Sequence, residues 1–94
     1  MPPLGIEFSA RFKAQARVLA AERRQLVAHA VDALSESFGK PHLHSGLGIR
    51  RLRGHVFEFR ADRDTRIVFV LEGSTASLLL VGSHDDVRRF VRNL

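Results

Sequence analysis

Arginine, glutamate and histidine side chains recur in the second half of this chain at spacings typical of strands and their ends. The stretch "HVFEFRADRDTRIVFV" contains Glu58, Arg60 and Arg66, and His84 follows the apolar run "LLLVG". The planar guanidinium of arginine bonds two phosphate oxygens at once, and histidine exchanges a proton near neutral pH. A carboxylate can accept a proton in the same kind of reaction. These residue types therefore suit phosphate binding combined with proton transfer.

Alternating apolar and polar residues predict the strands that position these side chains. The segments "HVFEFRA", "TRIVFVLEG" and "TASLLLVG" each fit a strand, and "IRRLRG" before them predicts another. If Asp62–Asp64 forms a tight loop, Arg60 lies opposite Arg66 and both project with Glu58 from one face of the sheet. The other face is then apolar and buried, and it carries Phe57, Phe59, Ile67, Phe69 and Leu71.

The first half of the chain predicts a strand followed by helix. Leu4–Phe8 is short and apolar, Ser9 is a suitable N-cap, and helical periodicity runs from Ala10 to Phe38. A continuous helix of that length would measure about 43 Å, which is too long for one small core. We therefore expect two helices that fold back on each other near Leu19–Glu22. Gly39 and Pro41 predict the end of the second helix.

A short helix is predicted at the C-terminus. Ser83 and Asp86 match the capping-box pattern, and apolar residues follow at helical spacing at Val87, Phe90, Val91 and Leu94. Most of the charge in "GSHDDVRRF" is then explained by helix capping and the helix dipole. Capping does not explain His84. Its alternative interpretation is a water-exposed residue in the first turn of this helix.

Together these elements predict an α+β fold in a single domain, residues 1–94. Its parts are an N-terminal strand, two helices, a curled, mainly antiparallel sheet and a short C-terminal helix. Hydrophobic residues make up 45% and charged residues 27%, as in ordinary globular domains. The longest apolar runs are too short to span a bilayer, and the first residues do not resemble a signal peptide. We therefore expect a cytoplasmic protein without a membrane partner.

Basic residues exceed acidic ones, with a formal net charge of +5. Only Lys13 and Lys40 are lysines, so arginine supplies nearly all of this positive charge. Such a balance favours RNA, DNA or an acidic protein as partner. The alternative is that the charge serves only solubility.

Histidines at His42 and His44 could lie on one strand face and hold a metal. The chain has no cysteine, however, and no third ligand is obvious nearby. We therefore predict no metal site.

The order and spacing of several short motifs resemble the RelE/ParE superfamily of toxins from toxin–antitoxin systems. The family's middle motif is matched by Gly54, Phe57, Glu58 and Arg60, followed by the strand "RIVF" from Arg66 to Phe69. The family's last strand often ends in Gly-x-His and an acid, which "GSHDD" matches. The resemblance covers nearly the whole chain and is closest to the RelE/YafQ-like branch.

This resemblance implies a ribosome-dependent mRNA endonuclease that cuts RNA by metal-independent attack of a 2′-hydroxyl. It also implies partners, namely the ribosome, mRNA and an acidic antitoxin that is partly disordered when free, and no small-molecule cofactor. By resemblance, Arg60 and Arg66 hold the phosphate and His84 is the acid or base. Glu58 is the other candidate base, and Asp64 matches a functional loop acid. The candidate RNA-binding rim consists of Lys40, His42, His44, Arg50, Arg51 and Arg53.

Three other interpretations remain open at this point. The chain has no tyrosine and no tryptophan, whereas many nucleases of the family carry a tyrosine near the C-terminus. A ParE-like poison of DNA gyrase shares the fold without the nuclease residues, and a non-toxic binding module is the other alternative. Arg60 and Glu58 could also form a surface ion pair without any catalytic role.

Overall fold

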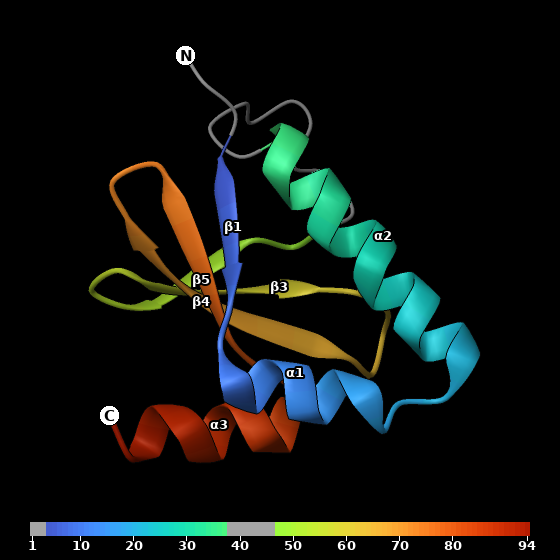
Figure 1. Ribbon diagram of the computed structural model, residues 1–94. Helices are drawn as coiled ribbons and strands as arrows, with labels where there is room; N and C mark the ends of the chain where they lie inside the picture. The colour runs from blue at the N-terminus through green and yellow to red at the C-terminus, as the bar shows by residue number, and fades with distance from the viewer. Residues whose placement is uncertain (1–3, 38–46) are drawn as a thin grey trace.

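A mixed sheet of five strands lies at the centre of the molecule, in the order β1-β5-β4-β3-β2. The computed structural model describes residues 4–37 and 47–94. The elements follow along the chain as β1 (Gly5–Phe8), α1 (Ala10–Arg17), α2 (Ala21–Ser37), β2 (Arg50–Arg53), β3 (Val56–Arg60), β4 (Arg66–Glu72), β5 (Thr75–Gly82) and α3 (His84–Arg92). This architecture confirms the predicted α+β fold, which is drawn in Figure 1.

The predicted break in the helical half is present between α1 and α2. Ser9 caps α1 by accepting a hydrogen bond from the backbone N–H of Phe12, and Val18 ends the helix. The guanidinium of Arg24 donates to the carbonyl of Leu19 over 2.9 Å and so satisfies one backbone group at the bend. The predicted stop at Gly39 and Pro41 lies outside the described residues.

The β3–β4 hairpin has the predicted register. Arg60 is the cross-strand partner of Arg66, and Glu58 is the partner of Val68. Within the loop, the backbone N–H of Asp64 donates to the Asp62 carboxylate over 2.8 Å, which fixes the turn locally. Among the strands that the structure describes, only β1 runs parallel to its neighbour, β5, so the sheet is mainly antiparallel as expected.

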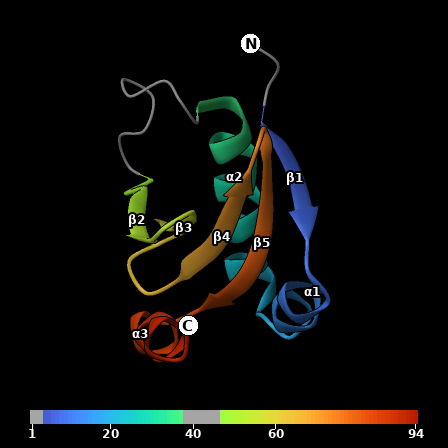
Figure 2. The same cartoon turned by 90° about the vertical axis from the view of Figure 1, so that its left-hand side faces the viewer.

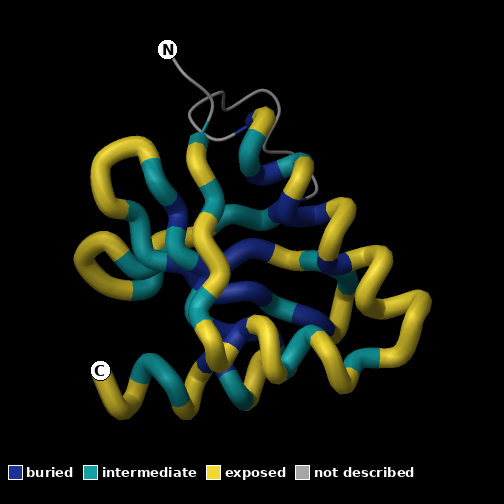
Figure 3. The backbone as a smooth tube through the Cα atoms, viewed as in Figure 1, coloured by how far each residue is buried: buried dark blue, intermediate teal, exposed yellow. Residues whose placement is uncertain are grey.

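Helix α2 covers one face of the sheet, and the main core lies between them (Figures 1 and 3). The apolar face predicted from strand alternation is confirmed: Phe59, Ile67 and Phe69 are fully buried, and Phe57 and Leu71 pack against the same cluster. The rings of Phe59 and Phe69 meet edge to face, with centroids 5.7 Å apart. From α2, Leu34 enters this core fully buried.

Helix α3 covers part of the second face, where Val68, Leu80 and Val87 form a smaller cluster. In Figure 2, α3 and α1 lie on either side of the end of β5. The predicted capping box of α3, between Ser83 and Asp86, is confirmed. The Ser83 backbone N–H, together with its hydroxyl, lowers the pKa of the Asp86 carboxyl. The arginine face is thus not fully open, because the apolar side of α3 needs burial against it.

Candidate functional site

A buried carboxylate lies between two arginines at the centre of the second face. Arg50 Nη2 lies 2.8 Å and Arg66 Nη1 lies 3.7 Å from the same oxygen, Glu58 Oε1. The three residues come from β2, β4 and β3 respectively, so the pairing of these strands brings them together. Arg50 is the direct cross-strand partner of Glu58. We call Arg50, Glu58 and Arg66 the arginine–glutamate cluster.

Glu58 is only 1% exposed, which differs from the expected position on an open face. Its neighbours in register, Arg50 on β2 and Val68 on β4, lie on either side of it. The contacts to both arginines are ion pairs by distance but lack hydrogen-bond geometry, and the buried Nε of Arg66 also has no hydrogen-bond partner. A charge buried in this way requires opposite charges close by, and the two guanidinium groups supply them.

Arg60 lies at the edge of this cluster and is held by a different segment. Its backbone N–H donates to the carbonyl of Leu47 over 2.7 Å. A Cβ added to Gly48 would lie 2.6 Å from Arg60 Nε, so the glycine makes room for this guanidinium. The surface ion pair considered between Arg60 and Glu58 is not formed, because Glu58 faces Arg50 and Arg66 instead.

His84 occupies the first turn of α3 and is exposed. Register places it just beyond Gly82, which is the cross-strand partner of Arg66. His84 and Arg50 line the same hollow of about 340 Å³. The rest of its lining is apolar or cationic and consists of Leu52, Val87, Arg88, Val91 and Arg92. Arg50 therefore joins His84 to the arginine–glutamate cluster.

Asp64 lies apart from this hollow. It lines a separate hollow of about 380 Å³ together with Thr65, Ser83 and Asp86. Its side chain is exposed at the β3–β4 loop. Of the five predicted catalytic residues, the structure brings Glu58 and Arg66 into contact. Arg60 is the cross-strand partner of Arg66 but lines another hollow, and His84 shares a hollow with Arg50. Asp64 lies apart from all of them.

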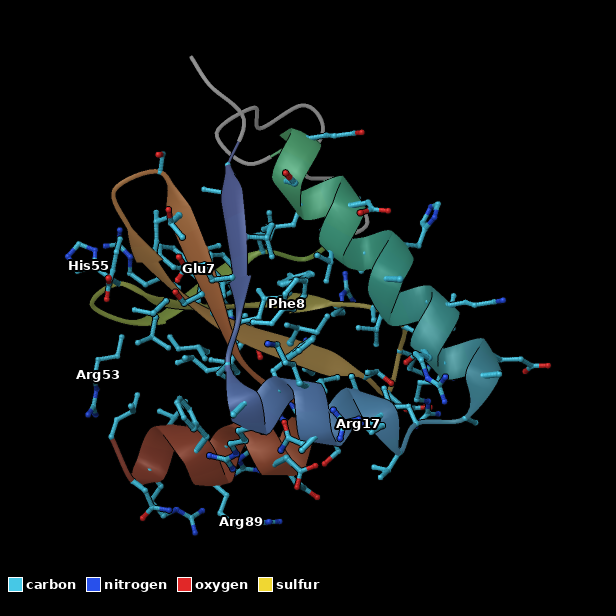
Figure 4. All side chains as sticks on the ribbon, in the orientation of Figure 1. Glu7, Phe8, Arg17, Arg53, His55 and Arg89 are labelled. Carbon is cyan, nitrogen blue, oxygen red and sulfur yellow. The ribbon has the colours of Figure 1, made fainter. Side chains whose placement is uncertain are left out.

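The predicted RNA-binding rim divides between different surfaces. Arg50 belongs to the arginine–glutamate cluster, whereas the guanidinium of Arg51 lies 5.4 Å from the ring centroid of Phe57 on the opposite face. Arg53 projects away from the sheet, and its Nη1 lies 3.4 Å from the carbonyl of Leu94 (Figure 4). Lys40, His42 and His44 lie outside the described residues.

No group of three metal-ligating side chains is found among residues 4–37 and 47–94. Within the same residues, no helix has the length and apolar character needed to cross a membrane.

Sequence reasoning missed several residues that shape the site. Gly48 makes room for Arg60, and its φ of 60° lies in the region that favours glycine. The glycines of "GLGI" were a signal for such a turn, but nothing local showed which side chain would occupy the space. The helix dipole was the only role considered for Arg88, yet Arg88 and Arg92 both line the hollow beside His84. Arg50 was assigned to an outer rim, yet it is the nearest partner of Glu58.

Comparisons by sequence find no matching family model and no matching curated protein. Comparison of the structure gives clear matches over nearly the whole chain. An archaeal RelE–RelB complex from Pyrococcus horikoshii matches with a TM-score of 0.69 at 12% identity, covering 88% of this chain and 96% of the other. A RelB–RelE antitoxin–toxin complex from Methanococcus jannaschii matches with a TM-score of 0.67 at 14% identity, covering 89% and 96%.

YafQ from E. coli matches with a TM-score of 0.59 at 13% identity, covering 89% of this chain and 97% of that chain. These TM-scores show a shared fold, although the sequences differ at most positions. They confirm the predicted resemblance at the level of architecture: this chain has the fold of the RelE-type toxins.

Proposed function

We propose that this chain is the toxin of a type II toxin–antitoxin pair and that it blocks translation by cutting mRNA on the ribosome. The 2′-hydroxyl of one nucleotide attacks the adjacent phosphate, and the 5′-oxygen of the next nucleotide leaves. The products are a 2′,3′-cyclic phosphate and a 5′-hydroxyl end. One proton leaves the attacking oxygen and one joins the leaving oxygen, so the reaction balances without a cofactor.

The observation that carries the proposal is the juxtaposition of several guanidinium groups, of which that of Arg66 is largely buried, with an exposed imidazole. Arg66 lies against Glu58 and opposite Arg60, and Arg50 connects them to the hollow that His84 lines. Negative charge builds up on the phosphate oxygens in the transition state, and arginines fixed in advance stabilise it most effectively. His84 is the exposed titratable group beside them and exchanges the proton.

The hollow beside His84 suits the nucleotide that flanks the cut. Its lining combines apolar Leu52 and Val91 with cationic Arg88 and Arg92. Bases of single-stranded RNA stack on guanidinium planes as well as on aromatic rings. Because the chain has neither tyrosine nor tryptophan, we assign this stacking role to arginine.

The charge of the chain supports an antitoxin partner. A net charge of +5 favours an acidic protein that neutralises the arginine face and folds as it binds. Among the solved structures with this fold are an archaeal RelE–RelB complex and an antitoxin–toxin complex. We propose that an acidic antitoxin covers Arg60 and Arg66 in the inactive state, which is a cytoplasmic complex.

Induced expression in bacterial cells tests this function. We expect growth arrest, new mRNA ends within translated regions, and recovery when the neighbouring antitoxin gene is co-expressed. The control is Arg17→Ala, which removes an exposed arginine from α1 (Figure 4). Arg17 is distant in sequence from the residues of the proposed site, and this variant should remain toxic. Double-strand DNA breaks with intact mRNA would instead support a gyrase poison. Unrestricted growth of cells that contain normal levels of this protein would contradict a toxin function of either kind.

A further inference from the structure

Glu58 is badly placed to act as a base. Its side chain is 1% exposed, whereas a base must come within hydrogen-bond distance of the RNA hydroxyl. Both Arg50 and Arg66 approach one carboxylate oxygen, Oε1, and the other, Oε2, is buried as well. His84, in contrast, is exposed on the hollow and needs no rearrangement to meet a substrate.

The two arginines beside Glu58 differ in how firmly the structure holds them. The side chain of Arg50 is 63% exposed and that of Arg66 only 22%. The Nε of Arg66 is buried and its Nη1 lies 3.7 Å from the Glu58 carboxylate, so burial and an ion pair both restrict this guanidinium. A free arginine side chain samples many rotamers, and ordering it on binding costs free energy. A fixed anion beneath Arg66 removes much of that cost before the RNA arrives.

We propose that Glu58 is the positioning residue of this site: its buried carboxylate fixes the Arg66 guanidinium in the orientation that meets the scissile phosphate, and it takes no part in proton transfer. This inference rests on the proposed ribonuclease function and assigns to Arg50 a second task. Arg50 is the nearer cation, at 2.8 Å, and it balances the charge of Glu58. The positive charge of Arg66 is therefore not used up by Glu58 and remains available to the substrate.

Register explains why the carboxylate can do this. Glu58 sits on β3 between Arg50 of β2 and Val68 of β4, with paired strands on both sides. The side chain therefore has little freedom to swing toward solvent, and the apolar cluster around Val68 and Leu80 lies beside it. A rigid carboxylate in such surroundings interacts strongly with nearby charge, because the local dielectric constant is low.

The test is Glu58→Gln, which keeps the shape and removes the charge. Cleavage of mRNA in a reconstituted translation system should fall about 10- to 100-fold in kcat, as expected when a catalytic group is misplaced slightly. The shape of the pH dependence of kcat should stay that of the wild type, since Glu58 takes no part in proton transfer. The matched control is Glu72→Gln, an exposed carboxylate at the end of β4, which should behave like the wild type.

A second readout does not depend on activity. In ¹⁵N NMR spectra, the buried Arg66 Nε–H should give a slowly exchanging signal in the wild type and a broadened or lost signal in Glu58→Gln. If Glu58→Gln does not fold, Glu58→Asp replaces it, because aspartate keeps the buried charge that Arg50 and Arg66 compensate and only withdraws the carboxylate from Arg66. The same loss of rate and of the Arg66 signal is then expected.

A double-mutant cycle with Arg66→Ala gives the sharpest comparison. If Glu58 acts through Arg66, adding Glu58→Gln to the Arg66→Ala variant should change kcat by no more than about twofold to threefold. A change of that size is about the error with which the effects of independent mutations add. Loss of the ascending limb of the pH profile in Glu58→Gln would make Glu58 the base and overturn the proposal. Unchanged kcat with an unchanged Arg66 signal would also overturn it. A wild-type protein that cuts no RNA refutes the proposed function, while the NMR comparison still decides whether Glu58 fixes Arg66.

Discussion

Replacing Arg66 with alanine removes a guanidinium that lies 3.7 Å from the carboxylate of Glu58, on a residue that is the cross-strand partner of Gly82 at the end of β5. A preorganised donor that meets the charge of a transition state typically contributes about 2.7–4 kcal/mol, or about 10²–10³ in rate. Arg66 is 22% exposed on its side chain, so solvent screens it less than a surface arginine and the upper part of this range applies. Glu58 keeps Arg50 at 2.8 Å, so the variant still balances its buried charge and should fold.

The assay is cleavage of a defined mRNA on translating ribosomes, with folding checked by circular dichroism and by antitoxin binding. We expect Arg66→Ala to cut about 10²–10³ times more slowly than the wild type. Arg66→Lys should recover little of this loss, because one ammonium cannot bond two phosphate oxygens in parallel. If Arg66→Ala folds, binds the antitoxin and cuts at the wild-type rate, Arg66 does not hold the scissile phosphate.

Two further predictions concern α3. Because the pKa of Asp86 is lowered in the folded protein, its stabilising effect is present above the ordinary aspartate pKa of 3.8 and is lost as the pH falls through the lowered folded pKa. Asp86→Asn should therefore reduce the free energy of unfolding by about 1 kcal/mol at neutral pH, and urea denaturation should show this difference shrinking in acid; a constant difference would contradict the assignment. Arg92→Ala should raise KM for mRNA more than it changes kcat, because Arg92 lines the hollow for the flanking nucleotide, whereas Arg17→Ala should leave both unchanged.

Much of the fold follows from local patterns in the sequence. The residues between β3 and β4 form a tight turn, and the alternation of side chains then determines that Arg60 meets Arg66. The capping box of α3 needs only Ser83 and Asp86, which are close in sequence. These features depend on near neighbours, and for that reason sequence reasoning predicted them correctly.

The burial of Glu58 and its pairing with Arg50 depend on contacts that no local pattern reveals. Strand β2 contains a register shift between Arg51 and Arg53, and the register before that shift decides that Arg50 faces Glu58. Gly48 lies before β2, and the Arg60 guanidinium that packs over it comes from the end of β3. This contact joins two segments that are not neighbours in the sequence. The same limit applies to Asp64: its place in the loop was predictable, but the hollow that it lines was not.

The measurement that tests the central claim most directly is cleavage of an mRNA carrying a single 2′-deoxynucleotide at the cut position. The proposed reaction uses the 2′-hydroxyl as nucleophile, so the deoxy substrate should resist cutting there while the all-ribose substrate yields 2′,3′-cyclic phosphate and 5′-hydroxyl ends. His84→Gln, which retains size and polarity but cannot exchange a proton, should reduce cutting of the ribose substrate about 10²- to 10⁴-fold. Equal cutting of the deoxy and ribose substrates, or 3′-hydroxyl and 5′-phosphate ends, would contradict this account.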